Sequence, residues 1–136
     1  MRKITLSKAK QRAWNAFSKY IRLRDCFKTT RRRDLGLCVT CSRAKEFKLL
    51  HAGHFLPGRH SSILFDEVGC HAQCYVCNVV LGGNGARYYE FMLKEYGLET
   101  INRLLEADRQ IKQMKVYQYQ ELEKQYKDLY YKLEGR

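Results

Sequence analysis

The sequence predicts an α+β fold: a central strand–loop–strand–helix core with a basic helix before it and a long helix after it. One observation is a set of cysteines in two Cys-x2-Cys pairs, Cys38 with Cys41 and Cys74 with Cys77. A second is the pair of short apolar stretches between them, which have strand character. A third is the recurrence of apolar residues at helical spacing on both sides of this core.

The first predicted helix covers residues 6–25, with Ser7 as the N-cap that accepts a hydrogen bond from a free backbone N–H. Its apolar stripe is formed by Ala13, Trp14, Phe17, Tyr20 and Ile21. Basic residues flank this stripe, and we expect two of them, Lys19 and Arg22, to follow a chain of phosphates. A polar basic loop is expected at residues 28–34. Its arginines Arg31, Arg32 and Arg33 either bind DNA or are only exposed to solvent.

The predicted core begins with a knuckle at residues 36–41 and a strand at residues 46–55. A loop containing Pro57 and Gly58 leads to a short second strand at residues 63–65, and the second knuckle covers residues 74–77. A helix is expected to start near Asn78 or after the glycine-rich residues 82–85, and to end at Gly97.

One long helix is predicted for residues 98–133, because no glycine or proline interrupts them. The 4-3-4 spacing of Leu122, Tyr126, Leu129 and Leu133 is typical of a coiled-coil seam. Either this seam packs on the chain's own core or it pairs with a second subunit. We therefore divide the chain into residues 1–97, the basic helix and stapled core, and residues 98–136, a long helix and possible dimerisation segment.

Two distant Cys-x2-Cys pairs predict one structural zinc ion bound by four thiolates, with disulfides or redox-active thiols as the alternative. The chain opens on a basic amphipathic stretch without a secretory leader, and it lacks an apolar run long enough to span a membrane. We therefore expect the cytoplasm, where disulfides are disfavoured, and no membrane partner. Cys26 and Cys70 remain; we expect buried thiols, with Cys70 as an alternative zinc ligand.

The positive charge is concentrated in one half of the chain. The net charge is +12; residues 1–60 carry 16 Lys/Arg against 3 Asp/Glu, whereas residues 61–136 carry 10 against 11. A basic half beside a neutral half is typical of a polyanion-binding protein, so nucleic acid is the expected partner, ahead of an acidic membrane or an acidic protein.

Four histidines within residues 51–71 suggest phosphodiester hydrolysis. His54, at the end of the first predicted strand, is our candidate for the base that deprotonates water. Asn78 follows a zinc ligand directly and can offer an amide oxygen to a catalytic divalent ion, with Asp66 and His71 as further candidate ligands. Arg59 and His60 are expected to hold the scissile phosphate. His51, an odd number of residues before His54, should face the other way and is interpreted as structural.

The chain resembles the phage NinG/Rap family of recombination endonucleases, which have an HNH-like (ββα-metal) fold. The matching stretches are residues 16–25, 38–41, 52–60, 64–67 and 71–78, in that order. The resemblance implies a phage or prophage enzyme that cuts branched DNA, namely Holliday junctions and D-loops, with Mg²⁺ or Mn²⁺. We expect no small-molecule cofactor. Because resolving a junction needs two nicks, we also expect a homodimer.

Two positions depart from the pattern of HNH nucleases. Asp or His commonly precedes the base as a metal ligand, but Gly53 stands there, and Gly69 and Cys70 stand where an Asn is usual. Other residues must therefore complete the ion site. The alternatives to a junction nuclease are a non-catalytic zinc-stapled nucleic-acid-binding module and an HNH nicking or homing nuclease or toxin.

Overall fold

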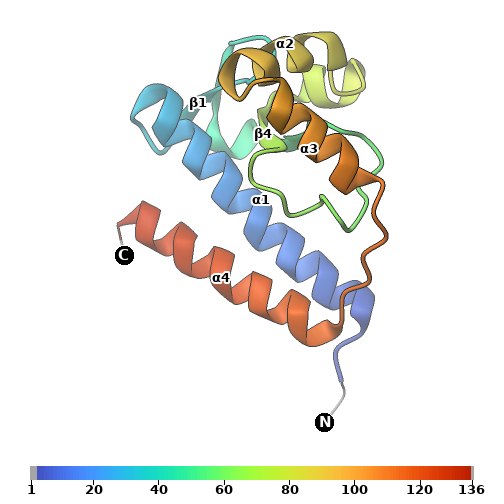
Figure 1. Ribbon diagram of the computed structural model, residues 1–136. Helices are drawn as coiled ribbons and strands as arrows, with labels where there is room; N and C mark the ends of the chain where they lie inside the picture. The colour runs from blue at the N-terminus through green and yellow to red at the C-terminus, as the bar shows by residue number, and fades with distance from the viewer. Residues whose placement is uncertain (1–2, 136) are drawn as a thin grey trace.

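The computed structural model describes residues 3–135 and has a mixed α+β fold (Figure 1). In chain order its elements are α1 (Leu6–Thr30), β1 (Leu35–Leu37), β2 (Ala44–Glu46), the 3₁₀ turn η1 (Phe47–Leu49), β3 (His51–His54), β4 (Cys70–Gln73), the π-helical turn η2 (Val76–Val80), α2 (Gly85–Glu95), α3 (Leu98–Asp108) and α4 (Val116–Glu134). No helix in this described part of the chain is both long and apolar enough to span a membrane.

Helix α1 starts at residue 6 as predicted, but its N-cap residue and its C-terminal end differ from the prediction. Its N-cap is Thr5, whose hydroxyl accepts from the backbone N–H of Lys8, and not Ser7. The helix continues to Thr30 because the hydroxyls of Thr29 and Thr30 bind carbonyls of the preceding turn. Arg31 then adopts the left-handed conformation and caps the helix through its N–H. The predicted loop at residues 28–34 therefore starts only after Thr30.

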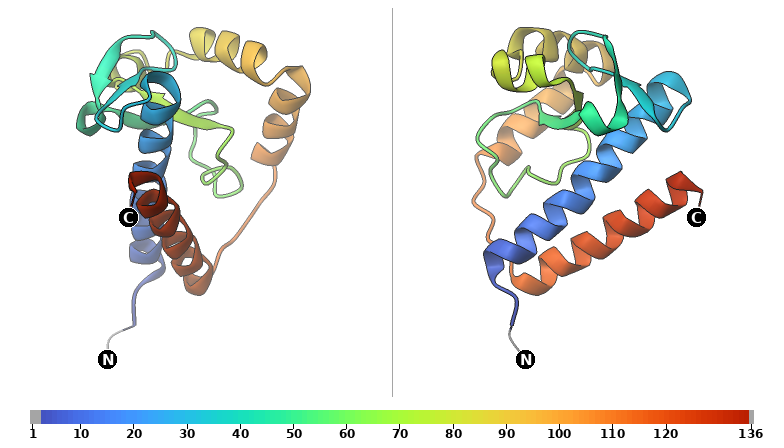
Figure 2. Two further views of the ribbon diagram at one scale, coloured as in Figure 1. Left: turned by 90° about the vertical axis from the view of Figure 1, so that its left-hand side faces the viewer. Right: turned by 180° about the vertical axis from the view of Figure 1, so that it is seen from behind.

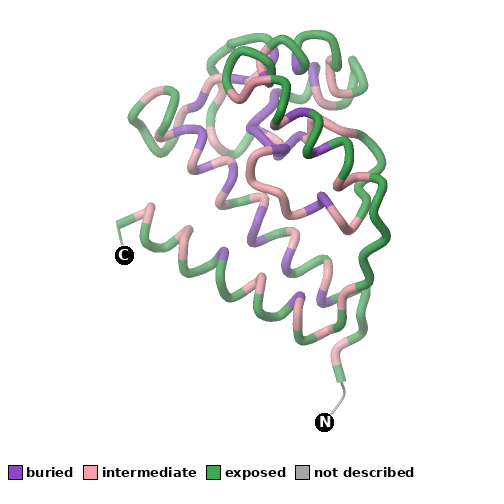
Figure 3. The backbone as a smooth tube through the Cα atoms, in the orientation of Figure 1, coloured by how far each residue is buried: buried purple, intermediate pink, exposed green. Residues whose placement is uncertain are grey.

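Helices α1 and α4 run side by side in the same direction, in both views of Figure 2 as in Figure 1. Tyr119, near the start of α4, packs on Ala9 and Ala13 of α1, and Tyr126 packs on Phe17 further along. The apolar seam of α4 is therefore used within the chain, as the first of the two alternatives predicted. Buried residues recur along most of α1 (Figure 3), which makes it the central element of the fold.

The predicted single helix over residues 98–133 is wrong. Helix α3 ends at Asp108, an extended linker covers residues 109–115, and α4 starts at Val116. The linker residues are mostly exposed, Ile111 to 93 %. A continued helix would gain nothing by burying them, whereas the break lets α4 fold back onto α1, where its seam is buried. The N–H of Lys115 donates to the side chain of Gln118 at 2.8 Å and caps the new helix.

The strands form two antiparallel pairs, β1 with β2 and β3 with β4. The second strand was predicted at residues 63–65, which is wrong. Ile63 and Leu64 instead form a turn whose N–H groups bind the carbonyl of His60, and both side chains are buried, so their apolar character serves the core. The partner of β3 is β4, and of the strand expected at 46–55 only residues 51–54 belong to β3, because Glu46 ends β2 and residues 47–49 form η1.

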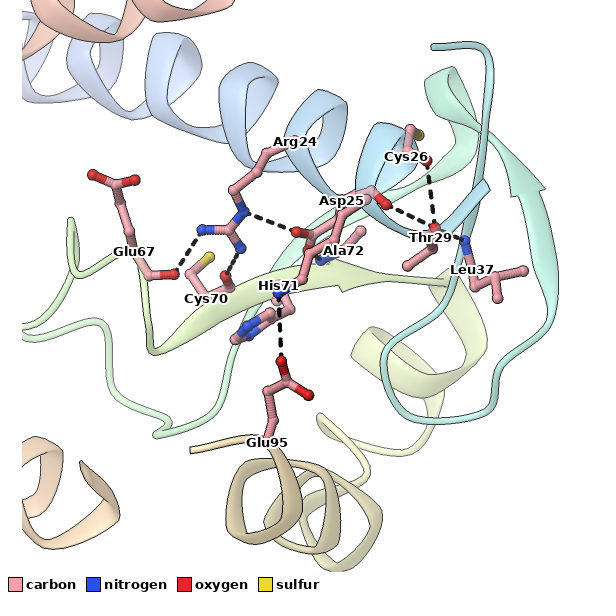
Figure 4. Close-up of polar contacts among 12 residues, drawn as sticks. Arg24, Asp25, Cys26, Thr29, Leu37, Glu67, Cys70, His71, Ala72 and Glu95 are labelled. Carbon is pink, nitrogen blue, oxygen red and sulfur yellow. Dashed lines mark hydrogen bonds and ion pairs between the residues drawn. The ribbon is translucent and has the colours of Figure 1, made fainter. Parts of the chain in front are cut away.

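A buried ion pair fixes β4 to α1 (Figure 4). The guanidinium of Arg24 donates to the carbonyls of Glu67 and Cys70 and to the carboxylate of Asp25, each at 2.8 Å. Asp25 in turn accepts from the backbone N–H of Ala72 at 2.7 Å. Every charged and polar group in this cluster is therefore paired, as burial requires. The cluster holds the β3–β4 hairpin, and the residues on it, in a fixed position on α1.

Candidate zinc centre and active site

The four cysteines of the two Cys-x2-Cys pairs come together in space. Their sulfur atoms all lie within 4.8 Å of one another, and Cys41 Sγ and Cys74 Sγ are 3.8 Å apart. A tetrahedron with zinc–sulfur bonds of about 2.3 Å has sulfur–sulfur edges of about 3.8 Å, so the arrangement fits a structural zinc ion. Cys26 and Cys70 are buried outside this cluster.

The cysteine cluster favours thiolate formation at one position. Burial opposes ionisation of Cys38, but hydrogen bonds from the Thr40 hydroxyl and from backbone N–H groups outweigh it and lower the pKa of Cys38 to about 6. The Thr40 hydroxyl lies 3.4 Å from Cys38 Sγ, and the Asn84 amide donates to Cys77 Sγ at 3.5 Å. Such contacts orient metal ligands and support their charge.

His54 lies at the end of β3 with its ring held on two sides. Its Nε2 is 3.0 Å from the carbonyl oxygen of Leu64, and its ring stacks on that of Trp14 with centroids 5.2 Å apart. A carbonyl oxygen can only accept, so Nε2 carries the proton of the neutral ring and Nδ1 keeps a lone pair. Within residues 3–135, Nδ1 has no hydrogen-bond partner.

Burial is the main cause that lowers the pKa of His54 below its ordinary value. The bond to Leu64 acts in the opposite direction, and the positive charge of Arg59 lowers the pKa further. The net shift keeps the imidazole neutral at pH 7. Arg59 itself lies over the Trp14 ring, with its guanidinium carbon 4.4 Å from the centroid. The structure thus places a histidine of lowered pKa near an arginine that was predicted to hold phosphate.

His51 and Asn78 meet on the opposite face of the hairpin from His54. Asn78, in η2, donates from Nδ2 to His51 Nδ1 at 3.1 Å. His51 pairs across the strands with Gln73, and its odd spacing from His54 turns it to the other face, as predicted. The sequence analysis did not single out Gln73, because residues 70–73 had not been recognised as a strand.

His71 is buried and fully hydrogen-bonded. The hydroxyl of Tyr88 donates to the carbonyl of Gly53 at 2.7 Å, so it accepts from His71 Nδ1–H. His71 Nε2 then accepts from the hydroxyl of Tyr96 at 2.9 Å. Burial lowers the pKa of His71 to about 4, so the ring is neutral. This network joins the hairpin to α2 and leaves no ring nitrogen of His71 for an ion.

Asp66 and His60 also have partners within the chain. One carboxylate oxygen of Asp66 accepts from the N–H groups of Val68 and Gly69, in the turn that leads into β4, and the other accepts from Arg103. His60 Nδ1 lies 2.7 Å from Asp108 at an exposed position. The structure therefore does not bring Asp66, His71 and Asn78 together as one ligand set.

The basic residues predicted to bind substrate fall into two groups. Lys19 and Arg22 line a groove of about 650 Å³ between α1 and α4, together with Arg12 and Lys127. In the segment after α1, Arg32 pairs with Asp34 at 2.8 Å and Arg33 donates to the carbonyl of Leu133 at 3.0 Å, while the backbone of Arg31 caps α1. Glu123 also lines the groove and pairs with Lys127 at 2.7 Å, so the positive charge of the groove comes from Arg12, Lys19 and Arg22.

Comparison with known proteins gives one result. A family model described as bacteriophage lambda NinG protein matches residues 2–135. No curated protein and no solved structure shows a significant match to the chain. The family match covers nearly the whole sequence, including both cysteine pairs and the β3–β4 hairpin. The chain therefore belongs to the bacteriophage lambda NinG protein family.

Proposed function

We propose that the protein is a metal-dependent, structure-selective DNA endonuclease with an HNH-like core, which cuts branched DNA in phage recombination. The proposal rests on the hydrogen bonding and the lowered pKa of His54. His54 is a neutral imidazole at the end of a strand, with Nε2–H fixed on a carbonyl and a lone pair left on Nδ1. A group of this kind is suited to take a proton from water near neutral pH.

Burial and Arg59 favour the neutral ring, but two contacts of His54 would offset part of the cost of the imidazolium that proton transfer creates. The bond from Nε2–H to the Leu64 carbonyl becomes charge-assisted and stronger once the ring is positive. The Trp14 ring stacked on the imidazole attracts the same charge through its π face. Arg59, beside Trp14, is the candidate for binding the scissile phosphate. A bound Mg²⁺ or Mn²⁺ would stabilise the charge that develops on the phosphate and the leaving oxygen, and Asn78 is the candidate ligand.

The groove between α1 and α4 supports DNA as the substrate. Three of its basic residues, Arg12, Lys19 and Arg22, lie on α1, the helix that also provides Trp14 beside His54, and the fourth, Lys127, lies on α4. The preference for branched DNA, the phage setting and the host cytoplasm come from the family resemblance. We also propose a homodimer that makes the two nicks. Since the α4 seam packs on α1, a second subunit would have to use another surface.

The test is cleavage of labelled four-way junction, flap and linear duplex DNA with Mg²⁺, Mn²⁺ or EDTA. Wild type is compared with His54→Ala and with the surface control Asn102→Ala, which changes an exposed amide on α3. We expect metal-dependent cutting of branched DNA, lost in His54→Ala with zinc content and DNA binding retained, because general-base catalysis typically contributes about 10²–10⁴-fold.

Tight DNA binding without cutting by wild type would reject the enzyme and favour the alternative of a zinc-stapled binding module. Equal cutting of all three DNA substrates would keep the nuclease but remove its selectivity for branches. Loss of DNA binding in His54→Ala would show that His54 has a structural role.

A further inference from the structure

We propose that the amide oxygens of Gln73 and Asn78 are the protein ligands of a divalent-cation site beside Gly53, and that His51 orients Asn78. The inference rests on the proposed function for the role of this ion. The sequence had predicted Asn78 as a ligand together with Asp66 and His71. The structure supports a different partner for Asn78, taken from the neighbouring strand.

Gln73 carries a buried oxygen without a hydrogen-bond partner. The side chain is fully buried, and Oε1 finds no donor in the described part of the chain. The orientation of the amide is fixed, because Nε2 donates to the carbonyl of Gly83 at 2.9 Å and to the Thr40 hydroxyl at 3.1 Å. An exchange of the two amide atoms would place oxygen against the Gly83 carbonyl. Since buried acceptors are normally satisfied, this oxygen points to a ligand.

Asn78 presents its oxygen to the same place. Its Nδ2 donates to His51, which directs Oδ1 away from His51. Oδ1 lies 3.2 Å from the position that a Cβ would occupy at Gly53, and Oε1 of Gln73 lies so close to that position that a Cβ would collide with it. In each amide, the NH₂ group donates to another residue and so fixes the direction of the oxygen. The two oxygens therefore both lie near the position that a side chain at Gly53 would occupy.

Position 53 has no room for a side chain, because the amide of Gln73 occupies the place of a Cβ. The φ of Gly53 is not positive, so the backbone conformation is open to other residues. Any side chain would nevertheless displace the amide of Gln73. The carbonyl of Gly53 is held by the hydroxyl of Tyr88 at 2.7 Å, so the strand cannot easily move away. The absence of a side chain thus leaves room for both oxygens beside Gly53, where Gln73 Oε1 is buried and Asn78 is half-buried.

The zinc centre fixes both proposed ligands. Thr40 contacts Cys38 Sγ on one side and Gln73 on the other, and Asn78 directly follows Cys77. Two neutral oxygens without a carboxylate suit a hard cation that keeps most of its waters and completes its shell with phosphate oxygens. We therefore expect weak binding of Mn²⁺ or Mg²⁺ by the protein alone and stronger binding in the presence of DNA.

The test measures Mn²⁺ binding to the zinc-loaded full chain by electron paramagnetic resonance of free Mn²⁺, with and without duplex DNA and with Mg²⁺ as competitor. Asn78→Ala should weaken Mn²⁺ binding by at least about tenfold, a typical loss when a metal site is disturbed. Asn78→Asp keeps the oxygen and adds charge, so it should bind Mn²⁺ more tightly. The matched control Asn102→Ala should bind like wild type.

A second variant probes Gln73 without changing it. In Gly53→Ala the new methyl group would push the Gln73 amide out of the site, so Mn²⁺ binding should fall although both ligands are present. Zinc content and melting temperature are measured for every variant, and only variants that retain zinc are compared. This separates loss of the ion site from loss of the fold.

Wild-type Mn²⁺ affinity in a zinc-loaded Asn78→Ala variant would overturn the proposal, as would the absence of Mn²⁺ binding by wild type with DNA present. Weaker binding in Asp66→Asn, with Asn78→Ala unchanged, would place the ion at Asp66 instead. Mn²⁺ binding that depends on Asn78 in a protein that cuts no DNA would keep the site and reject the nuclease. Metal-dependent cutting by wild type, together with unchanged Mn²⁺ binding in Asn78→Ala, would keep the nuclease and reject the proposed ion site.

Discussion

At the scale of single residues, the ring of His54 is controlled by three neighbours with different effects. Burial against Trp14 and the charge of Arg59 favour the neutral ring, whereas the Leu64 carbonyl fixes its tautomer. The orientation and the neutral form of the imidazole therefore depend on Trp14 of α1 and on Arg59 and Leu64 of the loop after β3. None of these contacts is local in the sequence except that of Arg59, five residues away.

The pH dependence of cleavage tests this arrangement. A general base is active when unprotonated, and the folded-state pKa of His54 is lowered, so the single-turnover rate should rise with pH below 6.5 and level off above it. Arg59→Gln removes a charge that lowers this pKa, so the rising limb should move to higher pH. A limb that stays in place in Arg59→Gln would show that another group controls the rate.

At the scale of elements, the two knuckles and the β3–β4 hairpin form one unit. Cys38 and Cys41 follow β1, and Cys74 and Cys77 follow β4, so a zinc ion bound by these four cysteines would join two segments that are distant in sequence. Gln73 and Asn78 border the second knuckle. A zinc ion bound there would have a structural role, and its loss should affect the proposed ion site as well as stability.

Cys74→Ser should therefore abolish stoichiometric zinc binding and lower the melting temperature strongly, because zinc binding is coupled to folding. Cys26→Ala removes a buried thiol outside the cluster and should keep its zinc while losing only packing energy. Zinc content by mass spectrometry and thermal unfolding measure both effects. An unchanged melting temperature in Cys74→Ser would contradict the role of the cluster as a staple.

At the scale of the whole molecule, seven of the 16 Lys/Arg residues in residues 1–60 lie on α1, which is also the central packing element. One face of α1 contacts α4 and the hairpin. Basic residues beside that face line the groove between α1 and α4. The same helix therefore provides the core and the proposed DNA-binding surface.

DNA affinity should fall steeply with salt concentration. Each neutralised phosphate of a duplex contributes about 0.9 to the slope of log affinity against log salt, so the double variant Lys19→Gln/Arg22→Gln should reduce this slope by about 2. The control Lys94→Gln/Lys124→Gln removes the same charge from exposed sites outside the groove and should change the slope less. Fluorescence anisotropy at several salt concentrations gives the slopes, and equal slopes for the two double variants would exclude the groove.

The sequence by itself determined the α+β class, the first helix, the four-cysteine cluster and the opposite directions of His51 and His54. These features follow from short spacings along the chain, since ligand pairs and helical or strand periodicity are set by neighbouring residues. The match to the family model is likewise a property of the sequence. The identity of His54 as a base remains a prediction.

Only the tertiary structure decided which segment pairs with β3, where the C-terminal helix breaks and which residues surround Asn78. Residues 63–65 resemble a strand locally but form part of a turn in which Ile63 and Leu64 are buried, and residues 98–133 break into two helices so that α4 can pack on α1. Asp66 and His71 have partners far away in the sequence, and Gln73 meets Asn78 only through the hairpin and the knuckle. Such contacts depend on the burial and hydrogen bonding of distant segments, which local spacing does not encode.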